Sequence, residues 1–298
     1  MAKLRYRSPQ WRRASSGISF SLILFALKDA AVKAYHDNCI GLAKEAAYSF
    51  ILSFFPMLLS LIVLFFLLGD TTRSVAEISI TLSKVLPADS QAIVANYISL
   101  MAARPPTRLL WISLAGTLWT SSGMMMTLHK SFNIIYEVRP YWGFWLRRFV
   151  AILLVIAVGI PLAISTVVTI FAQQVERQLE FYLSQYFSVD LWWVWVAARW
   201  LIVIITTVAI AALLYRVGGE QQKSWRGVLP GALLATGLWL GVTLLFNRYV
   251  QNFGSYNRIY GGLGAVIVLL VWMFLTTLSL LYGAEFNFQF ARRRGRWR

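Results

Sequence analysis

Three ionisable residues lie in or beside long apolar stretches, where a charge is costly and is therefore a candidate for function. Arg199 lies inside the fourth of six such stretches, and Glu45 and Glu285 lie at the ends of the first and the sixth. A carboxylate at this level can bind a cation or a substrate headgroup, and a guanidinium suits an anionic one. We therefore take Arg199, Glu45 and Glu285 as candidate substrate-binding residues.

Each of the three also has an interpretation without function. Tryptophans between 192 and 200 surround Arg199, as in an aromatic belt that lets a guanidinium reach the outer headgroups, and we favour this interpretation. A surface ion pair of little energetic value is the expected role of the two glutamates. Their candidate partners are Lys44, His129 and Arg292.

Two further features of the apolar stretches concern the backbone. Pro56 interrupts the first stretch and frees a carbonyl near Leu52, which can mark a binding site or a hinge, so Pro56 is a further candidate. Neighbouring helices more often satisfy such a carbonyl. Gly237 and Gly241 form a G-x-x-x-G motif, which predicts close helix packing.

Enzyme signatures are absent from the sequence. There is no G-x-S-x-G, Walker A loop, H-E-x-x-H or C-x-x-C motif, and no close set of carboxylates that can hold the two metals of a nuclease. One cysteine, Cys39, and two histidines are too few for a metal cage of these residue types. We expect no enzyme, no metal and no cofactor.

The elements that position these residues follow from the apolar composition. Of 298 residues, 58% are hydrophobic and 13% are charged, and the mean hydropathy is +0.63. A soluble domain carries about 25% charged residues, so the bilayer must solvate this chain. The predicted fold is all-α, a polytopic membrane protein with six transmembrane helices and additional interfacial amphipathic helices. The spans are 46–69, 109–128, 149–172, 191–214, 228–246 and 263–284.

Basic residues predict the orientation of these spans. The segments 1–45, 129–148, 215–227 and 285–298 carry 20 of the 28 Lys and Arg residues. Cytoplasmic flanks collect such residues, so we expect both termini to face the cytoplasm. The same rule accounts for most of the net charge of +16. We therefore expect the basic tail to contact anionic headgroups rather than nucleic acid.

The segments outside the spans complete the predicted organisation. Residues 1–45 form a cytoplasmic, amphipathic interfacial segment rather than a cleaved leader, with Asp29 and Lys33 as an i,i+4 pair. Residues 46–284 form one transmembrane domain. Its external loop, 70–108, has the periodicity of two short amphipathic helices broken at Pro87. Residues 285–298 form a basic cytoplasmic tail.

Blocks of sequence covering roughly residues 30–290 resemble the YihY/BrkB family of bacterial inner-membrane proteins. Phe50 departs from the pattern, because the family often has a small or tyrosyl residue there. The tyrosyl run of the third block contributes two further candidate substrate-binding residues, Tyr256 and Tyr260. The blocks are 46–59 with Tyr48, Ser53 and Pro56; 118–138 with Trp119, Gly123, Asn133 and Tyr136; and 214–287 with Pro230, Gly231, Tyr249, Tyr256, Tyr260, Gly261, Trp272, Gly283, Ala284 and Glu285.

The resemblance implies six membrane helices and a role in the envelope, and it supplies no catalytic residues. Members of the family were once labelled ribonuclease BN, a label later given to a soluble metallo-hydrolase, and others are linked to serum resistance and to export of lipid A precursors. We expect a non-enzymatic transporter or lipid translocator whose partners are the bilayer and anionic envelope lipids. A scaffold of envelope assembly is the alternative, a membrane enzyme is a third hypothesis, and homo-oligomers stay open.

Overall fold

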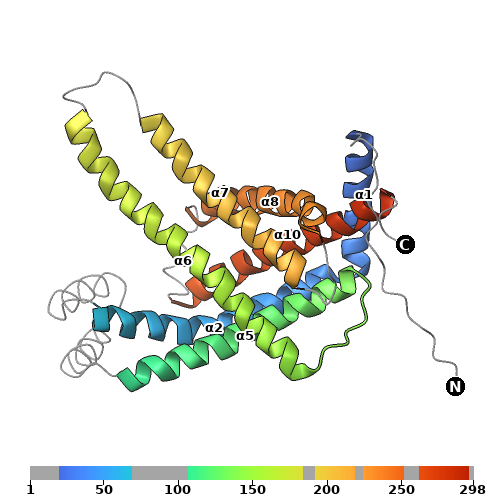
Figure 1. Cartoon of the computed structure of the whole chain (residues 1–298), viewed down its shortest axis with the longest axis horizontal. Coiled ribbons are helices and arrows are strands. Elements are labelled where there is room, and N and C mark those ends of the chain that lie inside the picture. The colour runs from blue at the N-terminus through green and yellow to red at the C-terminus, as the bar shows by residue number, and fades with distance from the viewer. Residues whose placement is uncertain (1–19, 69–106, 184–191, 219–223, 252–261, 295–298) are drawn as a thin grey trace. The chain divides into compact units, whose positions relative to one another are not determined.

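The computed structural model describes residues 20–68, 107–183, 192–218, 224–251 and 262–294, and all regular structure in these ranges is helical. This confirms the predicted all-α class. The helices follow one another along the chain as Figure 1 shows. They are α1 (Phe20–His36), α2 (Cys39–Leu68), α5 (Thr107–Ile135), α6 (Phe144–Leu183), α7 (Trp192–Val217), α8 (Trp225–Gln251) and α10 (Gly262–Arg293).

Each predicted span overlaps one of these helices, and among the described residues four segments are long and apolar enough to cross a membrane. Helix α5 is more polar. Its hydroxyl groups bond to carbonyls of the preceding turn, as Ser113 does to Leu110 at 3.0 Å, which lowers the cost of burying them. The total of six spans stays a prediction. The four segments are Phe144–Leu162, Ala197–Val217, Trp225–Tyr249 and Val266–Arg293.

The chain divides into two compact units. The smaller comprises Ser49–Ser121, and the larger comprises Met1–Tyr48 and Ser122–Arg298. In the smaller unit Pro56 lies inside α2, which continues through it as a helix, and its ring faces Gly116 of α5. The hydroxyl of Ser60 donates to the Pro56 carbonyl at 2.9 Å. Pro56 therefore has a packing role here, and its role in substrate binding stays a prediction.

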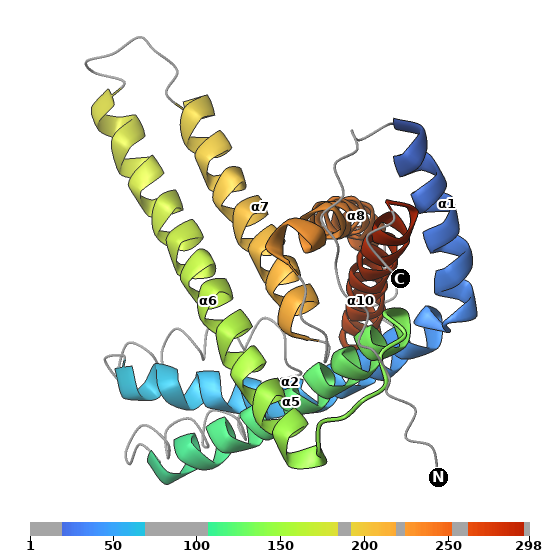
Figure 2. The same cartoon turned by 45° about the vertical axis from the view of Figure 1, so that its right-hand side comes forward.

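Helix α10 is the centre of the larger unit. It packs against α8 and α1, α7 packs against α8, and α6 packs against α7 (Figures 1 and 2). Every residue from 283 to 291 is buried, so this part of α10 is enclosed on all sides. A helix in the protein interior is expected to be surrounded in this way. The sequence of residues 283–291 is nevertheless not uniformly apolar, because polar and aromatic residues alternate from 285 to 290.

Glycines allow α8 and α10 to cross in direct backbone contact. A methyl group added to Gly231 would collide with the carbonyl of Gly283, and one added to Gly283 would collide with the carbonyl of Gly231. The predicted packing motif behaves differently. Gly237 and Gly241 are exposed, with no atom near the place where a side chain would begin, so that prediction is wrong for the described residues.

Small residues bring α1 against the same part of α10. Ala26 and Ala30 are fully buried and pack with Phe286 and Phe290. The hydroxyl of Tyr282 donates to the carbonyl of Leu27 at 2.8 Å, which joins α10 to α1 at this position and opposes sliding of one helix along the other. The predicted helix in this segment is therefore present, while its interfacial position stays a prediction. The predicted outer helices in 70–108 lie outside the described residues.

Candidate functional site

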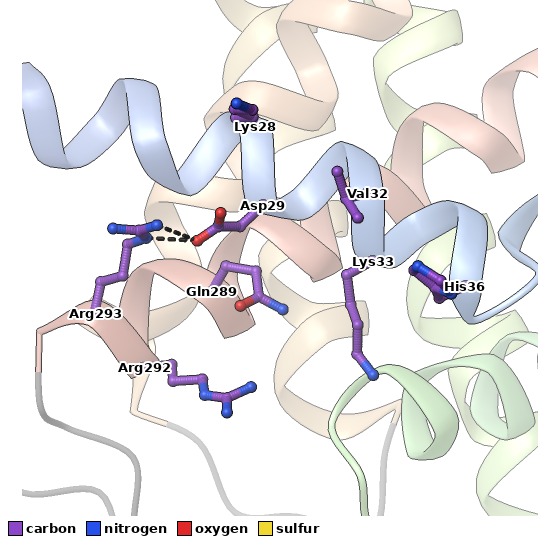
Figure 3. Close-up of a pocket in the computed structure, with 8 residues that line it drawn as sticks. All are labelled: Lys28, Asp29, Val32, Lys33, His36, Gln289, Arg292 and Arg293. Carbon is purple, nitrogen blue, oxygen red and sulfur yellow. Dashed lines mark hydrogen bonds and ion pairs between the residues drawn. The ribbon is translucent and has the colours of Figure 1, made fainter.

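A basic groove of about 490 Å³ lies between α1 and α10 (Figure 3). The lining residues of α1 lie at positions 28, 29, 32, 33 and 36, and those of α10 at 289, 292 and 293, and this spacing places each set on one helix face. Figure 3 shows Gln289 between Arg293 and Lys33. The lining consists of Lys28, Asp29, Val32, Lys33, His36, Gln289, Arg292 and Arg293.

Ion pairs hold two of the four cationic residues in the groove. Nε of Arg293 donates to Oδ2 of Asp29 at 2.6 Å. Nζ of Lys33 lies 3.1 Å from Oδ1 of Asp37 and 3.4 Å from Oε1 of Glu137. The predicted Asp29–Lys33 pair is wrong, because Asp29 pairs with Arg293 of α10, and Lys33 pairs instead with Asp37 and Glu137.

The other two cationic residues give the groove a positive charge that no acidic residue of the described ranges balances. Lys28 and Arg292 are both exposed, and neither forms an ion pair with any residue of the described ranges. A guanidinium and an ammonium in a groove of this size suit a phosphate or carboxylate group. The groove therefore has the chemistry of an anion-binding site at the end of two helices.

A two-residue hinge between α1 and α2, Asp37 and Asn38, places Asp37 beside Lys33. Asn38 has a φ of 55°, the left-handed conformation that asparagine adopts more readily than most residues. Its backbone N–H bonds to the carbonyl of Tyr35 at 3.2 Å, which ends α1, and its side-chain oxygen accepts the N–H of Gly41 at 3.3 Å, which caps α2. Only this two-residue turn separates the two helices.

The end of α5 supplies the second partner of Lys33. Glu137 also has a positive φ, 54°. The N–H of Val138 bonds to the carbonyl of Asn133 at 2.9 Å, and that of Glu137 bonds to Ile134 at 3.0 Å, which is a Schellman motif. This termination turns the chain so that Glu137 faces α1, while the preceding residue, Tyr136, is buried in the core.

A buried polar layer lies behind the groove on α10. Glu285, Asn287 and Gln289 are all buried. The amide of Asn287 accepts the N–H of Gly231 at 2.7 Å and donates to the carbonyl of Val228 at 3.0 Å, which joins α10 to α8. Gln289 belongs to both regions, because it lines the groove and lies beside Glu285.

The surroundings of this layer shift the pKa values of two groups outside the membrane-spanning segments, Lys33 and Cys39. Burial alone would lower the pKa of Lys33, but the bonds to Asp37 and Glu137 outweigh it and raise the pKa above its ordinary value. Burial raises the pKa of the Cys39 thiol to about 12, with a smaller contribution from the carboxylates of Glu285 and Asp37. Lys33 is therefore a firmly charged cation, and Cys39 is an inert thiol at neutral pH.

The structure separates the two predicted glutamates. Glu45 is exposed and forms a surface ion pair with Nζ of Lys130 at 2.9 Å, so the expected interpretation is confirmed with a different partner. For Glu285 that interpretation is wrong, because the side chain is fully buried. An exposed position allows a lysine to reach the carboxylate, whereas Glu285 lies on the enclosed part of α10 beside Asp37.

The other predicted residues do not line the groove. Arg199 is half-buried in α7, and its two interpretations stay open. Pro56 belongs to the smaller unit, and Tyr256 and Tyr260 lie outside the described residues. Sequence reasoning missed Lys28, Gln289 and Arg292 as groove residues. The spacing of basic residues on one face of α1 was the available signal, but only the contact with α10 makes that face one wall of a groove.

A second groove, of about 440 Å³, lies farther along α8 and α10. Its lining is apolar except for the hydroxyl of Tyr249, and it is formed by one face of each helix. Hydrocarbon is the chemistry that suits such a surface. The lining residues are Val242, Leu245, Phe246, Tyr249, Ile267, Val268, Val271 and Leu275.

Apolar helices of membrane length and a basic groove at their ends define an all-helical integral membrane protein. The chain belongs to the virulence factor BrkB family, whose model matches residues 30–297. It is 29% identical over 244 residues to a putative ribonuclease-like protein, YfkH, of Bacillus subtilis, which covers 82% of this chain and 86% of that protein. No solved structure matches the chain.

Membrane proteins of Xanthomonas are also similar. A UPF0761 membrane protein of Xanthomonas campestris pv. campestris (strain B100) is 32% identical over 182 residues, 58% of this chain, and one of Xanthomonas oryzae pv. oryzae (strain PXO99A) matches to the same extent. The match spans 40% of the length of these relatives. The resemblance noted in the sequence is thus confirmed at the level of the family.

Proposed function

We propose that this protein moves anionic envelope lipids across the bacterial inner membrane without catalysing a reaction, and that the α1–α10 groove binds the lipid headgroup. The single observation that carries the proposal is the pair of exposed cations, Lys28 and Arg292, in a groove whose other cations are already paired. A phosphate headgroup would complete the charge balance of the groove.

Two further observations support a lipid as the substrate. The groove lies at the end of α10, a helix apolar enough to cross a membrane, so a bound headgroup would sit near the level of the bilayer surface. The apolar groove between α8 and α10 would suit acyl chains. In this proposal both termini and the basic groove face the cytoplasm, where Lys and Arg collect.

The test is transbilayer movement of labelled lipid in liposomes that contain the purified protein. Fluorescent phosphatidylglycerol should cross faster than in empty liposomes, and labelled phosphatidylcholine should not. The double variant Lys28→Ala/Arg292→Ala should slow the movement on the order of tenfold, since two cations near the headgroup are removed.

A matched control removes the same charge elsewhere. Lys44 and Arg226 are exposed, and neither lines the groove, so Lys44→Ala/Arg226→Ala should retain the wild-type rate. Equal rates with and without protein would overturn the proposal, and stable partners in a detergent pull-down would then favour a scaffold. RNA cleavage by the purified protein that is lost in Glu285→Gln would instead favour an enzyme.

A further inference from the structure

Glu285 is a fully buried carboxylate that forms no ion pair with a basic residue of the described ranges. Its side chain is 0% exposed, and its polar neighbours are the side chains of Asp37 and Gln289. The carboxylate of Asp37 lies next to it, and Oδ2 of Asp37 is also buried. Two carboxylates therefore lie side by side, the Glu285 one fully buried and the Asp37 one with 12% of its side chain exposed.

The groups around this pair do not balance its charge. These groups come from every element packed around the pair. They are Lys33 of α1, Asp37 of the hinge, Cys39 of α2, Tyr136 and Glu137 at the end of α5, and Asn287 and Gln289 of α10. Lys33 is the cation among these described groups, and it is shared by Asp37 and Glu137. Glu285 thus has no cation of its own.

A proton is the cation that fits this place. A buried charge without a partner is unfavourable, and a carboxylate in that position becomes neutral by taking up a proton. A divalent metal needs more oxygen ligands than two carboxylates supply, and no group of three potential metal ligands lies together in the described ranges.

We infer that Glu285 is a proton-binding site coupled to the basic groove, so that an anionic phosphate headgroup and a proton bind together. The coupling runs through Lys33, which lines the groove and also holds Asp37. A phosphate that draws Lys33 away leaves the carboxylate pair without its cation, and Glu285 then takes a proton from the solvent. By reciprocity, the protonated pair releases Lys33 for the phosphate. The ligand in this inference rests on the proposed function.

Infrared spectroscopy of the full-length protein in lipid nanodiscs tests the proton site without any transport. The wild type should show the band of a protonated carboxyl group at neutral pH, and Glu285→Gln should lack it. Asp37→Asn removes the neighbouring negative charge, so it should move the titration of this band to lower pH. Glu45→Gln is the matched control, because Glu45 is an exposed carboxylate in a surface ion pair. A band that is absent from the wild type, or unchanged in Glu285→Gln, would overturn the inference.

Binding of short-chain phosphatidylglycerol tests the coupling. At pH values where Glu285 has lost its proton in the free protein but still holds it in the complex, wild-type affinity should fall about tenfold per pH unit, because one proton then accompanies each ligand. The affinity of Glu285→Gln should not change with pH, while that of Glu45→Gln should follow the wild type. Inorganic phosphate and phosphatidylcholine vesicles are parallel probes, and the phosphate effect without a lipid effect would identify free phosphate as the ligand. A pH-independent wild type that still moves lipid would overturn this inference and leave the proposed function intact.

Discussion

The two halves of the α8–α10 pair differ in what surrounds them. In the groove-proximal region, residues 225–236 and 277–293, α10 is enclosed from 283 to 291. In the groove-distal region, residues 237–249 and 266–275, α10 exposes large apolar side chains, as Ile267 does with 49% of its surface exposed, whereas α8 exposes such side chains in both regions, as Leu233 and Leu245 do. The comparison shows that glycine and polar contacts join α8 to α10 in the groove-proximal region. In the groove-distal region the apolar side chains of α10 are exposed, as is expected of a surface in contact with lipid.

Replacing Gly231, where α8 and α10 cross, should have the largest effect on the stability of the groove-proximal region. Gly231→Leu places a side chain against the Gly283 backbone, which cannot move aside, so we expect a loss of about 3 kcal/mol or more, or no folded protein. The measurement is thermal unfolding in detergent together with the monodisperse fraction on size exclusion.

The matched control is Gly237→Leu on the same helix, where the space for a side chain is open. It should leave the unfolding temperature within a degree or two of the wild type, since exposed sites rarely matter for stability. Equal damage from both substitutions would mean that the two regions do not differ as described.

Removing the amide of Asn287 is the next largest test. Asn287→Ala leaves the Gly231 N–H and the Val228 carbonyl buried without their side-chain partner, which should cost about 2–4 kcal/mol. Asn247→Ala changes the same residue type at an exposed position of the groove-distal region and should cost far less. Unfolding of the two variants in the same detergent gives the comparison, and an inverted order would contradict it.

The smallest expected effect concerns the thiol of Cys39. Because burial raises its pKa to about 12, it stays protonated and unreactive at neutral pH, and its alkylation should accelerate only as the pH approaches that value. The double variant Cys39→Ser/Ala31→Cys moves the thiol to an exposed position of α1 and should react quickly with a maleimide. Comparable rates for the two proteins would show that the start of α2 is open to solvent.

Much of the fold follows from the sequence, because long apolar stretches have few ways to satisfy their backbone in a bilayer. The helices and the membrane class were predictable for that reason. Helix pairing was not: the G-x-x-x-G at Gly237 and Gly241 has the right spacing, yet the crossing occurs at Gly231 and Gly283, which are 52 positions apart. A pattern within one helix does not say which helix faces it.

The candidate site was predictable only in part. Glu285 was a candidate because of its residue type and depth, but its burial depends on α1 and on the hinge at Asn38, which sequence periodicity does not reveal. Lys33 has acidic residues four positions away on either side, and the choice of Asp37 over Asp29 depends on Arg293 of a distant helix. Long-range competition of this kind has no signature in a local pattern.

The order of the helices has a consequence for biosynthesis. Helix α10 is enclosed by α1 and α8, and both of those precede it in the chain. While the ribosome is still making the segment before Gly262, the earlier helices lack the neighbour that completes their packing. The N–H of Gly231 and the carbonyl of Val228 then lack the side chain of Asn287 as their partner. A nascent chain arrested at that point should therefore be an early substrate for membrane proteases, and release of α10 from the translocon should end that vulnerability.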